Sequence, residues 1–331
     1  MNIYDIASKA GVSIATVSRV LNGKGNVSEK TKEHVLSIIE EMGYTPNIFA
    51  RGLGLNSIKM VGILCSDVSD IYYATAVSTI EKELRQSGYD SLLCCTGDNI
   101  EDRKKSIDLL LSKRVDAILL VGSTFKEKSD NSHILDAAKN VPFVMINDFI
   151  DAPNIYGIVC DDFNAVRENT SIFLEQGLRR IAYLYDADTY SGALKLSGFR
   201  AAFTQLNTLS DPELIVRCAH SPESAREQTL RLLQKQKRRL EAVVTSDDCL
   251  AVGALQAAVS AGLQIPHDIQ IIGFNNSLLA RCANPALTSI DNKVELLSVT
   301  AVRTLIDVFA HKNVSNKIVL SAELVKRSTT I

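Results

Sequence analysis

The spacing of apolar residues divides the chain into two parts. Between residues 2 and 44, apolar side chains recur with the period of a helix, in three short segments. From Lys59 onward, short and almost continuous apolar runs alternate with amphipathic stretches. Such runs are typical of strands buried on both faces of a parallel sheet, and the amphipathic stretches of the helices that cover it. The pattern predicts a small helical domain followed by a larger α/β domain.

A polar residue that can accept hydrogen bonds from free backbone amides precedes each of the three predicted helices. Asn2, Ser13 and Ser28 are these predicted caps, and Gly11 allows the chain to turn between the first two helices. Two consecutive helices joined by such a turn predict a helix-turn-helix. The residues expected to share one small core are Ile6, Ala7, Ala10, Val17, Val20, Leu21, Val35, Ile38, Ile39 and Met42.

The outer face of the second predicted helix has chemistry suited to reading DNA. Arg19 can donate two hydrogen bonds to guanine, and Ile14 and Ala15 can contact a thymine methyl group, with Ser18 and Asn22 on the same face. The alternative is that Arg19 is a solvated charge and Ile14 an edge-of-core residue. We favour DNA contact because apolar side chains on the outer face of a polar helix otherwise lack a purpose.

Charge alone does not indicate a nucleic-acid partner. The whole chain has 36 Lys and Arg against 38 Asp and Glu, a net charge of -2, so DNA contact must be local. Residues 1–57 contain six basic and five acidic residues, a net charge of only +1. One such domain would bind DNA weakly, so we expect a homodimer that reads two half-sites.

The segment after the helical domain is predicted to order only on DNA. Residues 46–56 contain two glycines, which lower helix propensity. Phe49, Ala50 and Leu53 are nevertheless spaced to share one face of a short helix, and Leu53 could enter a minor groove as a wedge. The alternative is an inert linker, which would not need Phe49 and Leu53.

The larger part is predicted to be two doubly wound lobes. Its apolar runs fall into two groups of four with a break near Asp161 and Asp162, and a cleft would lie between the groups. Ligands bind outside the carboxyl ends of such strands. The runs are VGILCS, YDSLLCC, VDAILLVG and PFVMIN, then IAYLYD, LIVRC, AVVTSD and IQIIGF.

Neither an enzyme nor a cofactor is predicted. No strand leads into G-x-G-x-x-G or a phosphate-binding loop, and the five histidines (34, 133, 220, 267, 311) form no spaced cluster and are expected at the surface. The seven cysteines contain no C-x-x-C pair, so we expect reduced core thiols and no metal site. The first residues lack a signal peptide and no run of about 18 apolar residues occurs, which predicts a cytoplasmic protein.

IYDIASKAGVSIATVSRVLNG followed by MGYTPNIFARGL resembles the headpiece and hinge of the lactose-repressor (LacI/GalR) family. Similar segments recur along the rest of the chain at VVTSDDCLAVGAL, IQIIGFNN, NPALTSID and LVKRSTT. The resemblance implies a transcription regulator, commonly a repressor, with a periplasmic-binding-protein-like effector domain. A plain binding protein such as a periplasmic sugar receptor is the competing class, and the headpiece argues against it.

The resemblance also implies domain bounds and DNA contacts. The headpiece would be residues 1–45, the hinge 46–58 and the effector domain 59–331, with one lobe at about 59–159 and 290–317 and the other at about 160–289 and 318–331. A homodimer would bind a pseudo-palindromic operator in double-stranded DNA, with the second helix in the major groove. By motif position, Ser18 and Arg19 inherit base contacts, Thr16 and Asn22 phosphate contacts, and Ala50 and Leu53 the hinge role.

Seven residues inherit the effector cleft by the same resemblance. Tyr72 and Tyr73 occupy the aromatic pair and could stack on a ring, or could instead pack between the lobes. The other five are Asn147 and Asn275, where the family often has aspartates; Lys195, where arginine is usual; Ser246, where asparagine is frequent; and Asp247.

These departures suggest an anionic effector. Two cleft carboxylates are missing and Lys195 adds a compact positive charge, which would suit a phosphorylated sugar or a sugar acid. The alternative is that Lys195 is a lobe-surface charge. A protein coregulator acting on the lobes in place of a small molecule is a further alternative.

Overall fold

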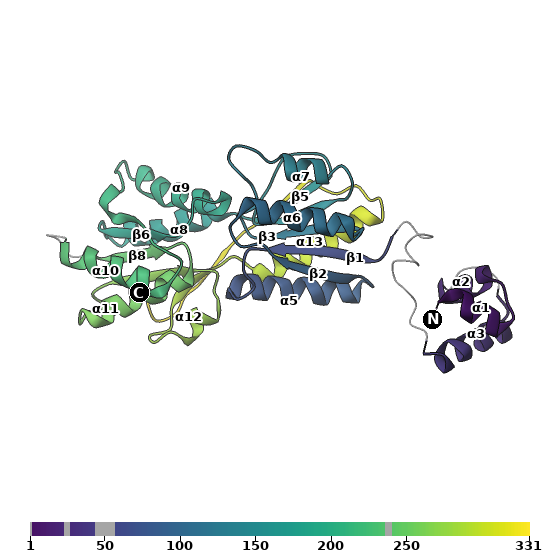
Figure 1. Ribbon diagram of the computed structural model, residues 1–331. Helices are drawn as coiled ribbons and strands as arrows, with labels where there is room; N and C mark the ends of the chain where they lie inside the picture. The colour runs from purple at the N-terminus through teal and green to yellow at the C-terminus, as the bar shows by residue number, and fades with distance from the viewer. Residues whose placement is uncertain (1, 23–26, 44–56, 236–239) are drawn as a thin grey trace. The chain divides into compact units, whose positions relative to one another are not determined.

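The computed structural model describes residues 2–22, 27–43, 57–235 and 240–331. The chain folds as two compact units, residues Met1–Lys59 and Met60–Ile331, and each is described by itself (Figure 1). Within the described residues, no helix is both long and apolar enough to cross a membrane.

The first unit contains the three predicted helices, α1 (Ile3–Ala10), α2 (Ile14–Asn22) and α3 (Glu29–Glu41). The Asn2 side chain accepts a hydrogen bond from the Tyr4 amide at 2.9 Å, and the Asp5 carboxylate accepts one from the Asn2 amide at 2.8 Å. This reciprocal pair stabilises the start of α1. Gly11 adopts a φ of 61°, the left-handed conformation that ends α1.

The other two predicted caps are also confirmed. Ser13 Oγ accepts from the Thr16 amide and Ser28 Oγ from the Thr31 amide, both at 3.2 Å. The three helices share one small core whose innermost side chains, one from each helix, are Ile6, Val17 and Val35.

The second unit contains two six-stranded sheets. The first sheet has the order β11-β5-β4-β3-β1-β2, and all of its pairs are parallel. Helices α5 (Ile71–Gln86) and α13 (Val294–Phe309) cover one face, and α6 (Ile100–Ser112) and α7 (Ser132–Ala137) the other. The strands are β1 (Met60–Cys65), β2 (Asp90–Cys95), β3 (Ala117–Val121), β4 (Phe143–Ile146), β5 (Ile155–Cys160) and β11 (Lys317–Leu320).

The second sheet has the order β12-β10-β9-β8-β6-β7, and β12 pairs antiparallel with β10. Helices α8 and α9 cover one face, and α10, α11 and α12 cover the other. The elements are β6 (Ile181–Tyr185), β7 (Ile215–Arg217), β8 (Ala242–Thr245), β9 (Gln270–Phe274), β10 (Thr288–Asp291), β12 (Glu323–Val325), α8 (Asp162–Glu175), α9 (Tyr190–Gln205), the short helix η1 (Pro212–Leu214), α10 (Pro222–Lys235), α11 (Asp248–Ser260) and α12 (Leu278–Cys282).

Two doubly wound lobes are as predicted, but the expectation of four strands in each is wrong. Strand β5 has a recognisable apolar run, whereas β10, β11 and β12 are only three or four residues long and mix polar with apolar side chains. The chain also passes between the lobes at other positions than expected. Residue 290 was expected in the first lobe, but Ile290 pairs with Phe274 and β10 belongs to the second sheet. Residues 318–320 were expected in the second lobe, but Leu320 pairs with Cys160 and β11 belongs to the first sheet.

Close packing of α8 against α9 depends on Gly198. A Cβ at this position would collide with the backbone carbonyl oxygen of Phe163 on α8. We expect Gly198→Ala to lower the free energy of unfolding by about 1–3 kcal/mol, because the two helices must separate. Chemical denaturation measures the change, and Ser197→Ala, at an exposed position on the same helix, is the control. Equal stability of the two variants would show that α8 and α9 adjust without cost.

Candidate DNA-reading surface and ligand cleft

The outer face of α2 presents the predicted DNA-reading side chains to solvent. Ile14 is 41% exposed, and Ala15 and Arg19 are also exposed, whereas Val17 and Val20 are buried against the other helices. Ser18 and Thr16 are half-buried, and Thr16 Oγ1 lies 2.9 Å from Ser13 Oγ at the start of the helix. An exposed guanidinium beside two exposed apolar side chains is able to contact base edges.

Three of the predicted DNA-contacting positions cannot be placed. Ala50 and Leu53 lie outside the described residues. The backbone of Asn22 ends α2, but its side chain also lies outside what is described. Their roles remain predictions from the resemblance.

A cavity of about 860 Å³ lies in the second unit, and all seven predicted effector residues line it. Asn147, Ser246 and Asn275 directly follow β4, β8 and β9, in agreement with ligand binding at the carboxyl ends of parallel strands. The complete set is Tyr72, Tyr73, Asn147, Lys195, Ser246, Asp247 and Asn275.

On the first lobe, Tyr72, Tyr73 and Asn147 form a polar, uncharged part of a cavity wall that elsewhere includes charged side chains such as Arg103 and Lys126. Asn147 Nδ2 donates to the Tyr72 hydroxyl at 3.0 Å, and Asn147 Oδ1 accepts from the Cys160 amide at 3.0 Å. The rings of Tyr72 and Tyr73 pack edge to face, with centroids 5.4 Å apart. Burial raises the pKa of Tyr73 to about 12 and that of Tyr72 well above its ordinary value. Both tyrosines therefore present neutral hydroxyl groups.

On the second lobe, Lys195 is neither a surface charge nor a free cation in the cavity. Its side chain is buried, and Nζ donates to the Ser246 carbonyl at 3.0 Å and lies 3.6 Å from the centroid of the Phe274 ring. Burial raises the pKa of the adjacent Asp162, and the charge of Lys195 acts against that rise. Because these groups already interact with the ammonium, the argument for an anionic effector is weakened.

A short hydrogen-bond chain orders the rest of the second-lobe wall. Asn275 Nδ2 donates to Asp247 Oδ2 at 2.6 Å, and Asn292 Nδ2 donates to Asn275 Oδ1 at 2.8 Å. Burial raises the pKa of Asp247 to about 7, against the opposing charge of His220. The Asn275 amide is thereby held at the cavity wall in one orientation.

A polar contact across the cleft that involves a histidine was not predicted from the sequence. His220 Nε2 lies 3.0 Å from Asp70 Oδ2, and Nδ1 lies 3.1 Å from Asp186 Oδ2. Asp70 caps α5 of the first lobe, whereas Asp186 follows β6 and His220 follows β7 in the second. His220 is exposed, as expected of the histidines, but it also joins the two lobes, which the sequence did not indicate.

Both partners of His220 favour its charged form. The hydrogen bonds that His220 donates to Asp186 and then to Asp70 raise its pKa to about 11. Burial opposes ionisation of Asp186, but the hydrogen bond and charge of His220, with a hydrogen bond from Ser246, lower its pKa to about 2. An imidazolium between the carboxyl groups of Asp70 and Asp186 therefore lies in the cleft at neutral pH.

A helix-turn-helix unit and a two-lobed α/β unit with a polar cleft together define a DNA-binding regulator with a binding-protein-like domain. Residues 2–47 match the family model described as bacterial regulatory proteins, lacI family, and residues 170–330 match the periplasmic binding protein-like domain. The chain belongs to the lacI family, as its sequence resemblance predicted, and it is a transcriptional regulator and not an enzyme.

Relatives and solved structures match the chain along its whole length. An HTH-type transcriptional regulator of Lachnoclostridium phytofermentans is 50% identical, covering 100% of this chain and 99% of the relative. The HTH-type transcriptional regulator DegA of Bacillus subtilis is 32% identical, covering 99% and 97%.

Two solved structures share the fold. The Lac repressor dimer bound to operator and the anti-inducer ONPF has a TM-score of 0.90 and 27% identity, covering 100% of this chain and 99% of that one. The transcriptional regulator CelR–cellobiose complex has a TM-score of 0.73 and 26% identity, covering 99% of each chain.

Proposed function

We propose that this protein is a dimeric repressor whose affinity for a pseudo-palindromic operator is controlled by a sugar-like effector bound between the lobes. The observation that carries the proposal is the cavity that the seven predicted effector residues line together. Two asparagine amides, two tyrosine hydroxyls and a carboxylate offer both donors and acceptors, which suits a ligand with many hydroxyl groups. The tyrosine rings offer apolar area for one face of such a ligand.

Two similarities support this assignment. The Lac repressor structure holds a dimer on its operator, and the CelR structure holds cellobiose. The engaged state of Lys195 favours a neutral sugar over an acidic one. On DNA, Arg19 with Ile14, Ala15, Ser18, Thr16 and Asn22 would read each half-site, and Ala50 and Leu53 would act in the hinge.

Control of DNA binding would use the passages between the lobes. The chain crosses between the two sheets after β5, after β10 and after β11, so ligand contacts on both walls can change how the lobes close. A coupling of about 1–3 kcal/mol between the cleft and the DNA-binding unit would change operator affinity roughly 5- to 150-fold.

The test begins with finding the operator. Purified protein is mixed with genomic fragments of its own organism, and retained fragments sharing a two-fold symmetric site identify the operator. Neutral sugars, acidic sugars and sugar phosphates are then titrated against the protein–operator complex by fluorescence anisotropy. A neutral sugar that changes operator affinity supports the proposal, whereas a response to acidic sugars alone would overturn the neutral assignment. A response only to a cell extract depleted of small molecules would indicate a protein coregulator.

Asn275→Ala is expected to raise the Kd of the active sugar by roughly 5- to 150-fold, which corresponds to about 1–3 kcal/mol for a buried polar partner lost. The measurement is calorimetric titration with the sugar found above. Asn276→Ala is the matched control, because the Asn276 amide donates to Asp291 at 3.1 Å and its side chain does not line the cavity. Equal effects of the two variants would place the sugar elsewhere.

A further inference from the structure

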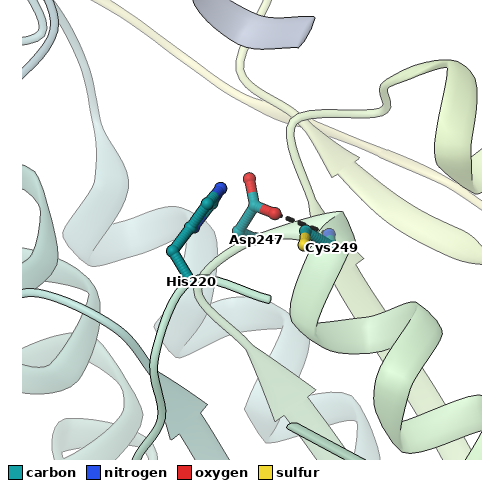
Figure 2. Close-up of side chains that lie close together, drawn as sticks. All are labelled: His220, Asp247 and Cys249. Carbon is teal, nitrogen blue, oxygen red and sulfur yellow. Dashed lines mark hydrogen bonds between the residues drawn. The ribbon is translucent and has the colours of Figure 1, made fainter. Parts of the chain in front are cut away.

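Three metal-ligating side chains of different kinds converge on the second lobe. One potential ligand atom each from His220, Asp247 and Cys249 lies within 4.8 Å of the others. Figure 2 shows these three side chains together, with His220 facing Asp247 and Cys249 in the first turn of α11. The sequence predicted a reduced core thiol at Cys249 and a surface residue at His220, so neither periodicity nor spacing indicated this cluster.

The donor set is one that zinc prefers. Imidazole nitrogen, carboxylate oxygen and thiolate sulfur are the ligands of tetrahedral zinc sites, whereas calcium and magnesium take oxygen ligands. Asp247 is already fixed in place, since its oxygens accept from the Cys249 amide and from Asn275 Nδ2. The dashed line in Figure 2 marks the first of these bonds.

The surroundings of His220 are those of a metal-ligating histidine. Such a residue binds the metal through one ring nitrogen and donates the other N–H to a carboxylate that fixes its orientation. Asp186 is the carboxylate suited to that role, because it lies 3.1 Å from Nδ1 and is itself held by a 3.0 Å hydrogen bond from Ser246 Oγ. Nε2 would then bind the metal, and Asp70, which lies 3.0 Å from Nε2, would give up its hydrogen bond.

We propose that His220, Asp247 and Cys249 bind a divalent transition-metal ion of the zinc class, with the fourth position left to water or a cleft ligand. Binding releases the Cys249 thiol proton and the Nε2 proton of His220 to solvent. All three protein ligands belong to the second lobe, and the ion would replace the hydrogen bond that joins His220 Nε2 to Asp70 of the first lobe.

Binding of the proposed ion does not depend on which sugar, if any, the cleft binds. The test titrates Co²⁺ into the full-length, reduced, metal-free protein and follows absorption. We expect a near-ultraviolet sulfur-to-cobalt band and the visible bands of tetrahedral cobalt, which Zn²⁺ then abolishes. Zn²⁺ should also raise the Tm of the wild-type protein.

The variants assign the band to particular ligands. Cys249→Ser should remove the sulfur-to-cobalt band, and Cys95→Ser and Cys282→Ser, at exposed cysteines, should retain it. His220→Gln and Asp247→Asn should each weaken cobalt affinity roughly 10-fold or more, with folding checked by circular dichroism. The proposal is overturned by a sulfur band that persists in Cys249→Ser, or by wild-type protein that shows no such band with excess Co²⁺.

Discussion

Replacing Arg19 with alanine is expected to lower operator affinity by roughly 30- to 25,000-fold. A bidentate arginine–guanine contact contributes about 1–3 kcal/mol of discrimination, and a dimer would lose it in both half-sites, about 2–6 kcal/mol in total. Arg19 is exposed on α2 and does not belong to the core that Ile6, Val17 and Val35 form, so the headpiece should remain folded. Fluorescence anisotropy with a labelled operator at one fixed salt concentration measures the change.

Lys9→Ala is the matched control for this loss. Like Arg19→Ala, it removes one positive charge from the helix-turn-helix domain. Lys9 lies on the surface of that domain, where its Nζ pairs with Glu41 at 2.7 Å. Such a pair contributes about 0–1 kcal/mol, so only a small change in affinity is expected. Comparable losses of affinity in the two variants would mean that Arg19 acts only through its charge. Unchanged affinity in Arg19→Ala would mean that Arg19 is a solvated side chain that does not contact DNA.

Two further measurements distinguish an arginine that reads a base from one that contacts only phosphate. They are binding to operators with altered sequence and the dependence of binding on salt concentration. A base-reading arginine contributes mainly to the specific site, so Arg19→Ala should relax specificity at one position of each half-site. Its binding should keep nearly the same dependence on salt, because the number of neutralised phosphates is unchanged. A lysine or arginine that contacts only phosphate would instead weaken binding to all sequences alike.

Features set by short-range chemistry could be predicted from the sequence. The caps at Asn2, Ser13 and Ser28 depend on residues only two or three positions away, and the structure has all three. The seven cavity residues were named from the family resemblance, and three of them, Asn147, Ser246 and Asn275, directly follow parallel strands whose carboxyl ends meet at one edge of a sheet. Asp186 directly follows β6 and His220 lies three positions after β7, so inspecting the loop after every strand would have drawn attention to both.

Features set by long-range contacts could not be predicted. Asp70 and His220 are 150 positions apart and meet only because the two lobes face each other. The state of Lys195 depends on the Ser246 carbonyl and on the Phe274 ring, neither of which is close in sequence. Periodicity indicates which face of a helix or strand is buried, but it does not identify the partner that neutralises a charge.

Asp248→Ala is expected to lower the free energy of unfolding by about 3–5 kcal/mol, as removal of one partner from a buried charged network does. Asp248 begins α11 and is 1% exposed. Its Oδ2 accepts from the amide and the hydroxyl of Ser277 at 2.7 and 2.8 Å, and its Oδ1 accepts from Ser289 Oγ at 2.6 Å. Alanine would leave these donors buried without their acceptor, at about 1–3 kcal/mol each.

The same substitution should weaken effector binding, because Ser277 lies two positions beyond Asn275 in the loop that follows β9. The room for Asp248 comes from Gly273, where a Cβ would collide with Asp248 Oδ1, so the network is built into β9 itself. Chemical denaturation measures stability, and Asp136→Ala, which removes a surface aspartate paired with Lys139, is the control with an expected loss of about 0–1 kcal/mol. If Asp248→Ala unfolds at the same denaturant concentration as Asp136→Ala, the buried network orders the cavity wall without stabilising the fold.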